Sequence, residues 1–181
     1  MNRIFSFHIV SVDGYYQGPE GEFDWPNIDE GFNAFAVAQL REIDTIVFGR
    51  RTYEHMAAYW PTEEALETDP EVAALMNSYA KIVVSHTLTT AEWHNTEVIT
   101  DPALLRATPG TLAVFGSSEL TTSLLTAGLI DELRVMIHPL VLGAGRPLFH
   151  TATRRHPLTL TQSRTFSSGN VLLTYHPTTS P

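Results

Sequence analysis

Two adjacent arginines follow a short apolar run in the first third of the chain. Residues 44–54 read Asp-Thr-Ile-Val-Phe-Gly-Arg-Arg-Thr-Tyr-Glu, so a strand would end at Gly49 and a helix would begin with Arg50, Arg51 and Thr52. The first amides of a helix lack intrahelical partners and lie at the positive end of its dipole, so they bind anions. The pattern predicts a site for a phosphorylated cofactor. The alternative is a solvated helix start whose arginines neutralise nearby acids.

Two later segments have the same form, an apolar run that stops at small or basic residues. Residues 81–87 end in Ser85, His86 and Thr87, and residues 111–120 pass from Val-Phe into Gly-Ser-Ser-Glu-Leu. Ligands of open α/β sheets bind outside the carboxyl ends of the strands. One such segment is a weak signal because strands commonly end in Gly or Ser. Three of them predict one shared anion-binding edge.

These segments, with others, resemble the dihydrofolate reductase-like superfamily, and within it the branch of the C-terminal reductase domain of the riboflavin-biosynthesis enzyme RibD. The motifs keep the order of that family over most of the chain. They lie at residues 11–14, 46–53, 82–87, 114–120, 128–133, 139–145 and 148–149. The Asp-Glu-Leu and Gly-x-Gly elements of the later motifs favour the riboflavin branch over dihydrofolate reductase itself.

The resemblance implies an NADPH-dependent reductase that transfers hydride to a small heteroaromatic or pyrimidine-type substrate, similar to 5-amino-6-(5-phosphoribosylamino)uracil reductase. By the same resemblance, the turns after the three strands hold the 2′-phosphate, the pyrophosphate and the nicotinamide side of the cofactor. The residues placed there are Gly49, Arg50, Arg51, Thr52, Ser85, His86, Thr87, Gly116, Ser117, Ser118, Glu119 and Leu120. Arginine suits phosphate because its planar fork stays charged and donates bidentately. Two arginines and a histidine favour NADPH over NADH.

The chain departs from the family pattern at Gly116-Ser117, where dihydrofolate reductases usually carry Gly-Gly, often joined by a cis peptide bond. A cis bond before a residue other than proline costs about 3 kcal/mol. Serine tolerates that geometry less well than glycine, which argues against a cis bond here. Ser117 and Ser118 still suit the capping of a helix or the binding of phosphate.

Fewer residues indicate the substrate side. Asp13 follows the first predicted strand beside the proposed nicotinamide edge, and we predict that it binds substrate or assists proton transfer. The alternative is an ordinary Asp-Gly turn. His8 and Trp25 are the other predicted substrate contacts, although a histidine within a strand also fits a hydrogen-bonded core position. The loop at residues 15–27 is expected to form a lid or pocket wall.

Composition narrows the possible functions. The 181 residues are 43% hydrophobic, which fits one domain, predicted at residues 1–177 with a flexible tail at 178–181. The net charge of −9 opposes binding to nucleic acid or anionic membranes. The chain has no cysteine, no His-x-x-x-His pair and no apolar run long enough to span a membrane. We therefore expect no metal site and a cytoplasmic location.

Apolar periodicity and turn residues predict alternating strands and helices. Strands are expected at residues 3–10, 45–49, 81–85, 96–100, 111–116, 131–138, 158–166 and 170–176, and helices at 29–43, 51–59, 70–79, after Asp101 and at 117–127. The last two strands flank a tight turn and must be antiparallel. The fold class is α/β: a dihydrofolate reductase-like three-layer fold with a mixed, mostly parallel central sheet and a C-terminal antiparallel hairpin. The riboflavin branch uses this region in a dimer, so the resemblance also implies a homodimer.

Two other functions remain open. A non-catalytic protein of the same fold would bind a nucleotide or another ligand without turnover. A dihydrofolate reductase proper needs a buried carboxylate on the helix after the Trp-containing loop. Asp29 and Glu30 lie near that place, but acids at the positive end of a helix more simply cap it. Oxidation of NADPH by a pyrimidine or a pterin distinguishes an enzyme from a binding protein.

Overall fold

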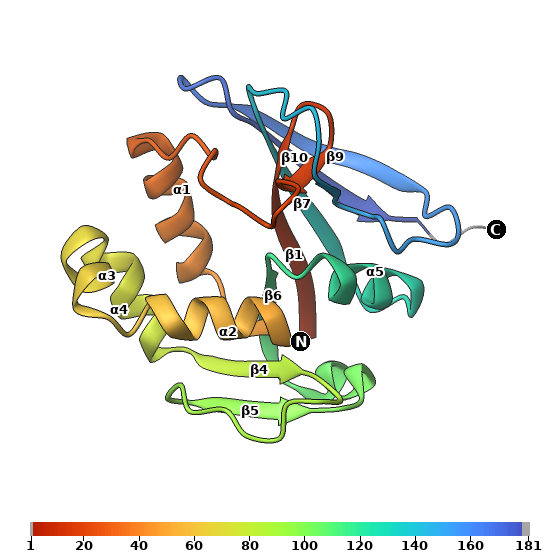
Figure 1. Cartoon of the computed structure of the whole chain (residues 1–181). Coiled ribbons are helices and arrows are strands. Elements are labelled where there is room, and N and C mark those ends of the chain that lie inside the picture. Colours follow the sequence, from red (N-terminus) through yellow and green to blue (C-terminus); the bar gives the residue numbers. More distant parts are fainter. Residues whose placement is uncertain (1, 179–181) are drawn as a thin grey trace.

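A single eight-stranded sheet forms the centre of the molecule (Figure 1). The structure is a computed structural model and describes residues 2–178. The strand order is β5-β4-β3-β6-β1-β7-β10-β9. The strands are β1 (Asn2–Ser11), β3 (Thr45–Gly49), β4 (Ala80–Val84), β5 (Thr96–Ile99), β6 (Gly110–Phe115), β7 (Glu132–His138), β9 (Leu158–Thr165) and β10 (Val171–Pro177). The pairings of β10 with β7 and with β9 are antiparallel and the other five are parallel, so the sheet is mixed and mostly parallel, as predicted.

Helices cover both faces of this sheet and complete the three predicted layers. They are α1 (Glu30–Arg41), α2 (Arg50–Tyr59), α3 (Glu63–Thr68), α4 (Pro70–Ser78), the 3-10 helix η1 (Pro102–Ala107) and α5 (Ser118–Thr126). α1, α2 and α4 pack on one face around a core that includes Phe5 and Phe48. α5 and η1 pack on the other face around Ile4 and Leu124. Ile4 and Phe5 serve different cores because successive side chains of a strand point to opposite faces.

The sequence missed three short elements. A two-stranded sheet joins β2 (Tyr15–Gln17) to β8 (Arg146–Pro147). Its strands are too short to show an alternating pattern. α3 is a six-residue helix whose signal was the hydroxyl of Thr62, which accepts a hydrogen bond from the amide of Ala65 at 3.2 Å.

The predicted C-terminal tail is described at one residue only. Of the predicted tail, only Thr178 belongs to the described residues, and its amide donates to the carbonyl of Pro157 at 2.9 Å. The rest of that tail, residues 179–181, lies outside them.

Within residues 2–178, no helix has the length and apolar character needed to cross a bilayer.

We predict that Leu124→Ala lowers the free energy of unfolding by about 2–5 kcal/mol, because it opens a cavity between α5 and the sheet. Leu124 is completely buried. Urea unfolding measures the change. Ser123→Ala, at an exposed position of the same helix, is the control and should change the unfolding free energy by less than about 0.5 kcal/mol. Equal losses in the two variants would show that Leu124 does not anchor α5.

Candidate functional site

The carboxyl ends of β4, β3 and β6 lie side by side, because β3 pairs in parallel with both other strands. Gly49 ends β3, Ser85 follows β4, and Gly116 follows β6. The structure therefore brings together, at one edge of the sheet, the three segments whose endings the sequence singled out. This edge is the candidate cofactor site.

The helices α2 and α5 begin at this edge, and neither has a side-chain cap at its N-terminus. α4 also lacks a side-chain cap. In α1, α3 and η1 a side-chain oxygen accepts a hydrogen bond from an amide of the first turn; the capping residues are Asp29, Thr62 and Asp101. The first turn of α2 also lacks an acidic residue. Two helix starts with free amides and positive dipole ends make this edge suitable for an anion.

The two helix starts are joined through Ser117. Its hydroxyl accepts a hydrogen bond from the amide of Gly49 at 2.9 Å and donates to the carbonyl of Phe115 at 3.2 Å. Gly116, between Phe115 and Ser117 in the chain, has a φ of +60°. A Cβ on this residue would lie 3.4 Å from the Thr52 methyl group. The space would admit a Cβ, so it is the positive φ that favours glycine at position 116. Within residues 2–178 no peptide bond is cis, so the bond between Gly116 and Ser117 is trans.

The hydroxyls of Ser117 and Ser118 do not have the predicted role. Ser117 occupies the N-cap position of α5, but its hydroxyl makes no capping bond. The Ser118 hydroxyl donates to the carbonyl of Leu148 at 2.6 Å, and both serines are buried. These hydroxyls fix the position of α5 in the fold, so the backbone amides are what the N-terminus of α5 offers to a ligand.

The two arginines of α2 differ in their surroundings. Arg50 forms an ion pair with Glu54 one turn along the helix, at 3.0 Å. This is the arrangement expected if the arginine only neutralises nearby acids. Arg51 is exposed and has no ion-pair partner among the described residues. Arg51 is therefore the guanidinium at this edge that is free to bind an anion.

The turn after β4 divides into a structural and an exposed part. The Ser85 hydroxyl is buried and accepts hydrogen bonds from the amides of Thr87 and Leu88, at 3.2 and 3.0 Å. This turn leaves His86 and Thr87 exposed. Ser85 thus shapes the turn, and His86 and Thr87 are available to a ligand.

A basic segment beside α5 went unnoticed in the sequence. It contains Arg146, His150, Arg154, Arg155 and His156. The Nε2 atom of His150 lies 3.5 Å from the carboxylate of Glu119 in the first turn of α5. Leu120, which follows, packs against the core on the α5 face. The available signal was the concentration of basic residues in an otherwise acidic chain.

Asp13 has a structural role at the end of β1, and its predicted role in proton transfer stays a prediction. Its carboxylate accepts hydrogen bonds from the Ser11 hydroxyl at 2.7 Å and from the amides of Leu142 and Gly143 at 3.0 and 2.8 Å. The bond from Ser11, followed by that from the Leu142 amide, lowers the pKa of Asp13 to about 2. The group is therefore ionised at neutral pH. Asp13 holds the loop after β7 against the end of β1, which matches the turn alternative.

His8 is a core residue and does not line a pocket as predicted. It is 2% exposed, and its Nε2 atom lies 2.9 Å from the Thr121 hydroxyl on α5. Burial lowers the pKa of His8 to about 3, so the imidazole is neutral at pH 7. The hydrogen-bonded core alternative is the one that the structure supports.

Trp25 lies in the loop that precedes α1, and this loop is fastened to the end of β7. The rings of Trp25 and His138 meet edge-on, with centroids 6.1 Å apart. The amide of Asn27 donates to Nδ1 of His138 at 2.8 Å, so the proton of this neutral imidazole is on Nε2. Asp29 caps α1, because its carboxylate accepts a hydrogen bond from the Phe32 amide at 2.8 Å. This capping role is the alternative to pterin binding that the sequence indicated.

The RibD C-terminal domain family matches residues 3–172. The chain belongs to this family. A relative in Bacillus subtilis (strain 168), the uncharacterized protein YyaP, is 36% identical over 181 residues, which cover 96% of this chain and 94% of YyaP. Within residues 2–178 no cluster of His, Asp and Glu side chains is arranged to hold a metal ion.

Solved structures share the fold. A putative riboflavin biosynthesis protein from Shewanella sp. PV-4 gives a TM-score of 0.75 at 24% identity, over 98% of this chain and 99% of that protein. The diaminohydroxyphosphoribosylaminopyrimidine deaminase/5-amino-6-(5-phosphoribosylamino)uracil reductase of Thermotoga maritima gives 0.69 at 12%, over 98% of this chain and 57% of that one. Dihydrofolate reductase from Enterococcus faecalis, complexed with NADP(H), gives 0.63 at 18%, over 97% and 96%. The fold is therefore dihydrofolate reductase-like.

We predict that Asp13→Asn lowers the melting temperature at pH 7, because one amide oxygen cannot replace both carboxylate oxygens. The depressed pKa means that Asp13 stabilises the fold above the ordinary Asp pKa of 3.8, and that this stabilisation is lost as the pH falls toward about 2. The melting-temperature gap between wild type and variant should therefore shrink between pH 5 and pH 3. Acid also destabilises both proteins through His8, so the gap is the quantity to measure. A gap that stays constant with pH would show that the ionised Asp13 carboxylate does not stabilise the fold through these hydrogen bonds.

Proposed function

We propose that this protein is an NADPH-dependent reductase that acts on a small heteroaromatic or pyrimidine-type substrate. The observation that carries the proposal is the meeting of two helix N-termini without side-chain caps, α2 and α5, beside the guanidinium of Arg51, which has no ion-pair partner within residues 2–178. Membership of the RibD C-terminal domain family supports the reductase class. The fold shared with a dihydrofolate reductase complexed with NADP(H) supports the choice of cofactor.

The residues at this edge fit a dinucleotide with an extra phosphate. Arg51, with the exposed His86 and Thr87, would hold the 2′-phosphate, since guanidinium and hydroxyl groups are good phosphate donors. The amides at the starts of α2 and α5 would hold the pyrophosphate. Gly116 has no Cβ and allows the backbone to come close to it.

The chemistry at the substrate end depends on positioning. When bound, NADPH supplies the hydride that a carbonyl or imine carbon accepts. The chain's task is to hold the ring of the substrate next to the nicotinamide and to keep bulk water out, and we assign part of this task to the loop that carries Trp25. Asp13 is ionised and fully hydrogen-bonded, so we assign the proton to water and give Asp13 a supporting role.

Two alternatives have less support. A dihydrofolate reductase needs a buried carboxylate at this place, whereas Asp29 caps α1 and Glu30 is exposed. A binding protein without turnover would use the same edge and is distinguished by assay. The proposed substrate class is taken from the substrate in the name of the Thermotoga maritima enzyme and from the RibD C-terminal domain family. The homodimer and the cytoplasmic location stay predictions.

We predict that NADPH binds more tightly than NADH and that Arg51→Ala removes this preference. The loss of one charged hydrogen-bond donor should weaken NADPH binding roughly 10- to 100-fold and leave NADH binding nearly unchanged. Quenching of tryptophan fluorescence measures both affinities. Arg41→Ala is the control, since Arg41 is an exposed arginine that pairs with Glu71 on α4, far from the edge. Equal affinity of the wild type for the two nucleotides would remove the 2′-phosphate site from the proposal.

We also predict that Asp13→Asn lowers turnover by less than about tenfold. A positioned general acid contributes roughly 100- to 10,000-fold to a rate, whereas loosening of a supporting loop should cost less than about tenfold. The assay follows NADPH oxidation with 5-amino-6-(5-phosphoribosylamino)uracil and, separately, with dihydrofolate. A loss of 100-fold or more in kcat at unchanged NADPH affinity would restore Asp13 as the proton donor. Tight NADPH binding without oxidation by either substrate would favour the binding protein.

A further inference from the structure

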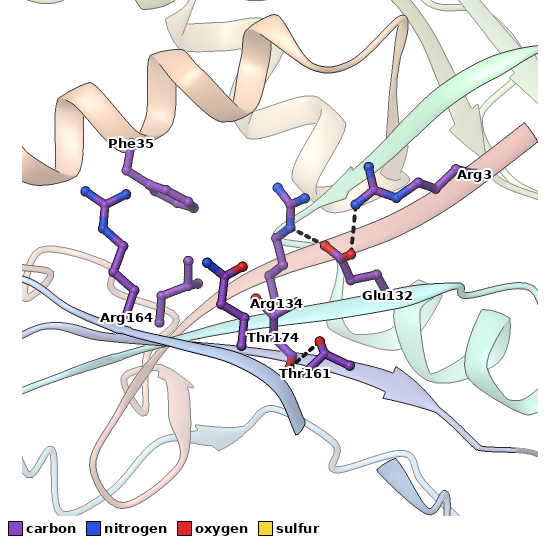
Figure 2. Close-up of a pocket in the computed structure, with 9 residues that line it drawn as sticks. Arg3, Phe35, Glu132, Arg134, Thr161, Arg164 and Thr174 are labelled. Carbon is purple, nitrogen blue, oxygen red and sulfur yellow. Dashed lines mark hydrogen bonds and ion pairs between the residues drawn. The ribbon is translucent and has the colours of Figure 1, made fainter. Parts of the chain in front are cut away.

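A pocket of about 350 Å³ lies across β1 from the candidate cofactor edge, between α1 and the β7–β10–β9 part of the sheet (Figure 2). Three arginines line it: Arg3 from β1, Arg134 from β7 and Arg164 from β9. Phe35 of α1 and Leu172 of β10, both largely buried, supply the apolar part of the lining, and the rest of it is polar: Glu132, Thr161, Gln162 and Thr174. Three of the eleven basic residues of an acidic chain thus lie around one pocket that the proposed reductase does not use.

Arg134 is held rigidly at the base of this pocket. It is 9% exposed, and its Nε atom donates to Glu132 at 2.5 Å. Its Nη1 atom donates to Gln39 at 3.1 Å and also to Glu42. The guanidinium carbon lies 3.9 Å from the centre of the Phe5 ring. These bonds leave Nη2 as the unused nitrogen of a preorganised guanidinium.

The carboxylates near the pocket are already paired. Glu132 accepts from Arg134 through one oxygen and from Arg3 through the other, at 2.8 Å. Glu42 pairs with Arg134 and, more distantly, with Arg3. Arg164 has no ion-pair partner within the part of the chain that the structure describes, and its guanidinium lies 4.4 Å from the Phe166 ring centre. Three guanidiniums therefore face two carboxylates.

We infer that this pocket binds a small monocarboxylate with a flat apolar body. The surplus of one positive charge matches a monoanion. The planar guanidinium of Arg164 can bind a carboxylate through paired hydrogen bonds, and Arg134 has one nitrogen, Nη2, left to donate. Phe35 and Leu172 suit an apolar body, and the pocket falls within the usual range of roughly 300–1,000 Å³ for small-molecule sites. The site is independent of the cofactor edge, so the inference stands or falls separately from the reductase.

The test is a calorimetric titration of the purified protein with benzoate as the probe. Benzamide, which has the same ring and no charge, and inorganic phosphate, which has the charge and no ring, are the comparison probes. Benzoate should bind tightest of the three. Arg164→Gln should weaken benzoate binding at least about tenfold through loss of a charged donor. Arg155→Gln is the matched control, because Arg155 is an exposed arginine outside the pocket.

Several results would overturn the inference. Benzamide binding as tightly as benzoate would exclude recognition of the charge, and phosphate binding as tightly would exclude recognition of the apolar body. Equal benzoate affinity in Arg164→Gln and Arg155→Gln would move the site elsewhere. Sedimentation velocity of the same samples tests for a second copy of the chain in the pocket. Dissociation of a dimer by Arg164→Gln, without benzoate binding to the wild type, would assign the pocket to the partner chain.

Discussion

The parallel pairing of β3 with β4 and β6 is the constraint on which the candidate cofactor site depends. It places three strand endings at one edge, and every helix that follows such an ending must start there. The Ser117 hydroxyl then joins the start of α2 to the end of β6 through Gly49 and Phe115. The site is thus made mainly of backbone amides, which the fold aligns, and of a few basic side chains at its rim.

This dependence on backbone explains what the sequence could predict. Apolar runs that end in Gly or Ser gave the strands, their shared edge and the hairpin, because these follow from local patterns and from the geometry of parallel pairing. The family motifs gave the topology. The short elements β2, β8 and α3 were missed because two to six residues carry too little periodicity to register.

Side-chain roles were harder to predict because they depend on contacts between distant parts of the chain. Asp13 looked like a catalytic acid beside a turn, but its partners include amides about 130 positions away, at Leu142 and Gly143. His8 was assigned to a pocket, but α5 covers it through Thr121. No local pattern encodes either contact. The alternatives of turn and core, which rest on general frequencies, were better guides at these two positions.

The arginine pocket raises the question of why a core position carries charge at all. Burying Arg134 requires desolvation of its guanidinium and of Glu132, and a buried ion pair is often no more stabilising than well-packed apolar residues of similar volume. Stability alone therefore gives little reason for the cluster. A rigid guanidinium with one nitrogen left over lies in the same pocket as Arg164, which has no ion-pair partner among the described residues. This arrangement is better explained by recognition of an anion. The two halves of the sheet, on either side of β1, would then bind two different ligands.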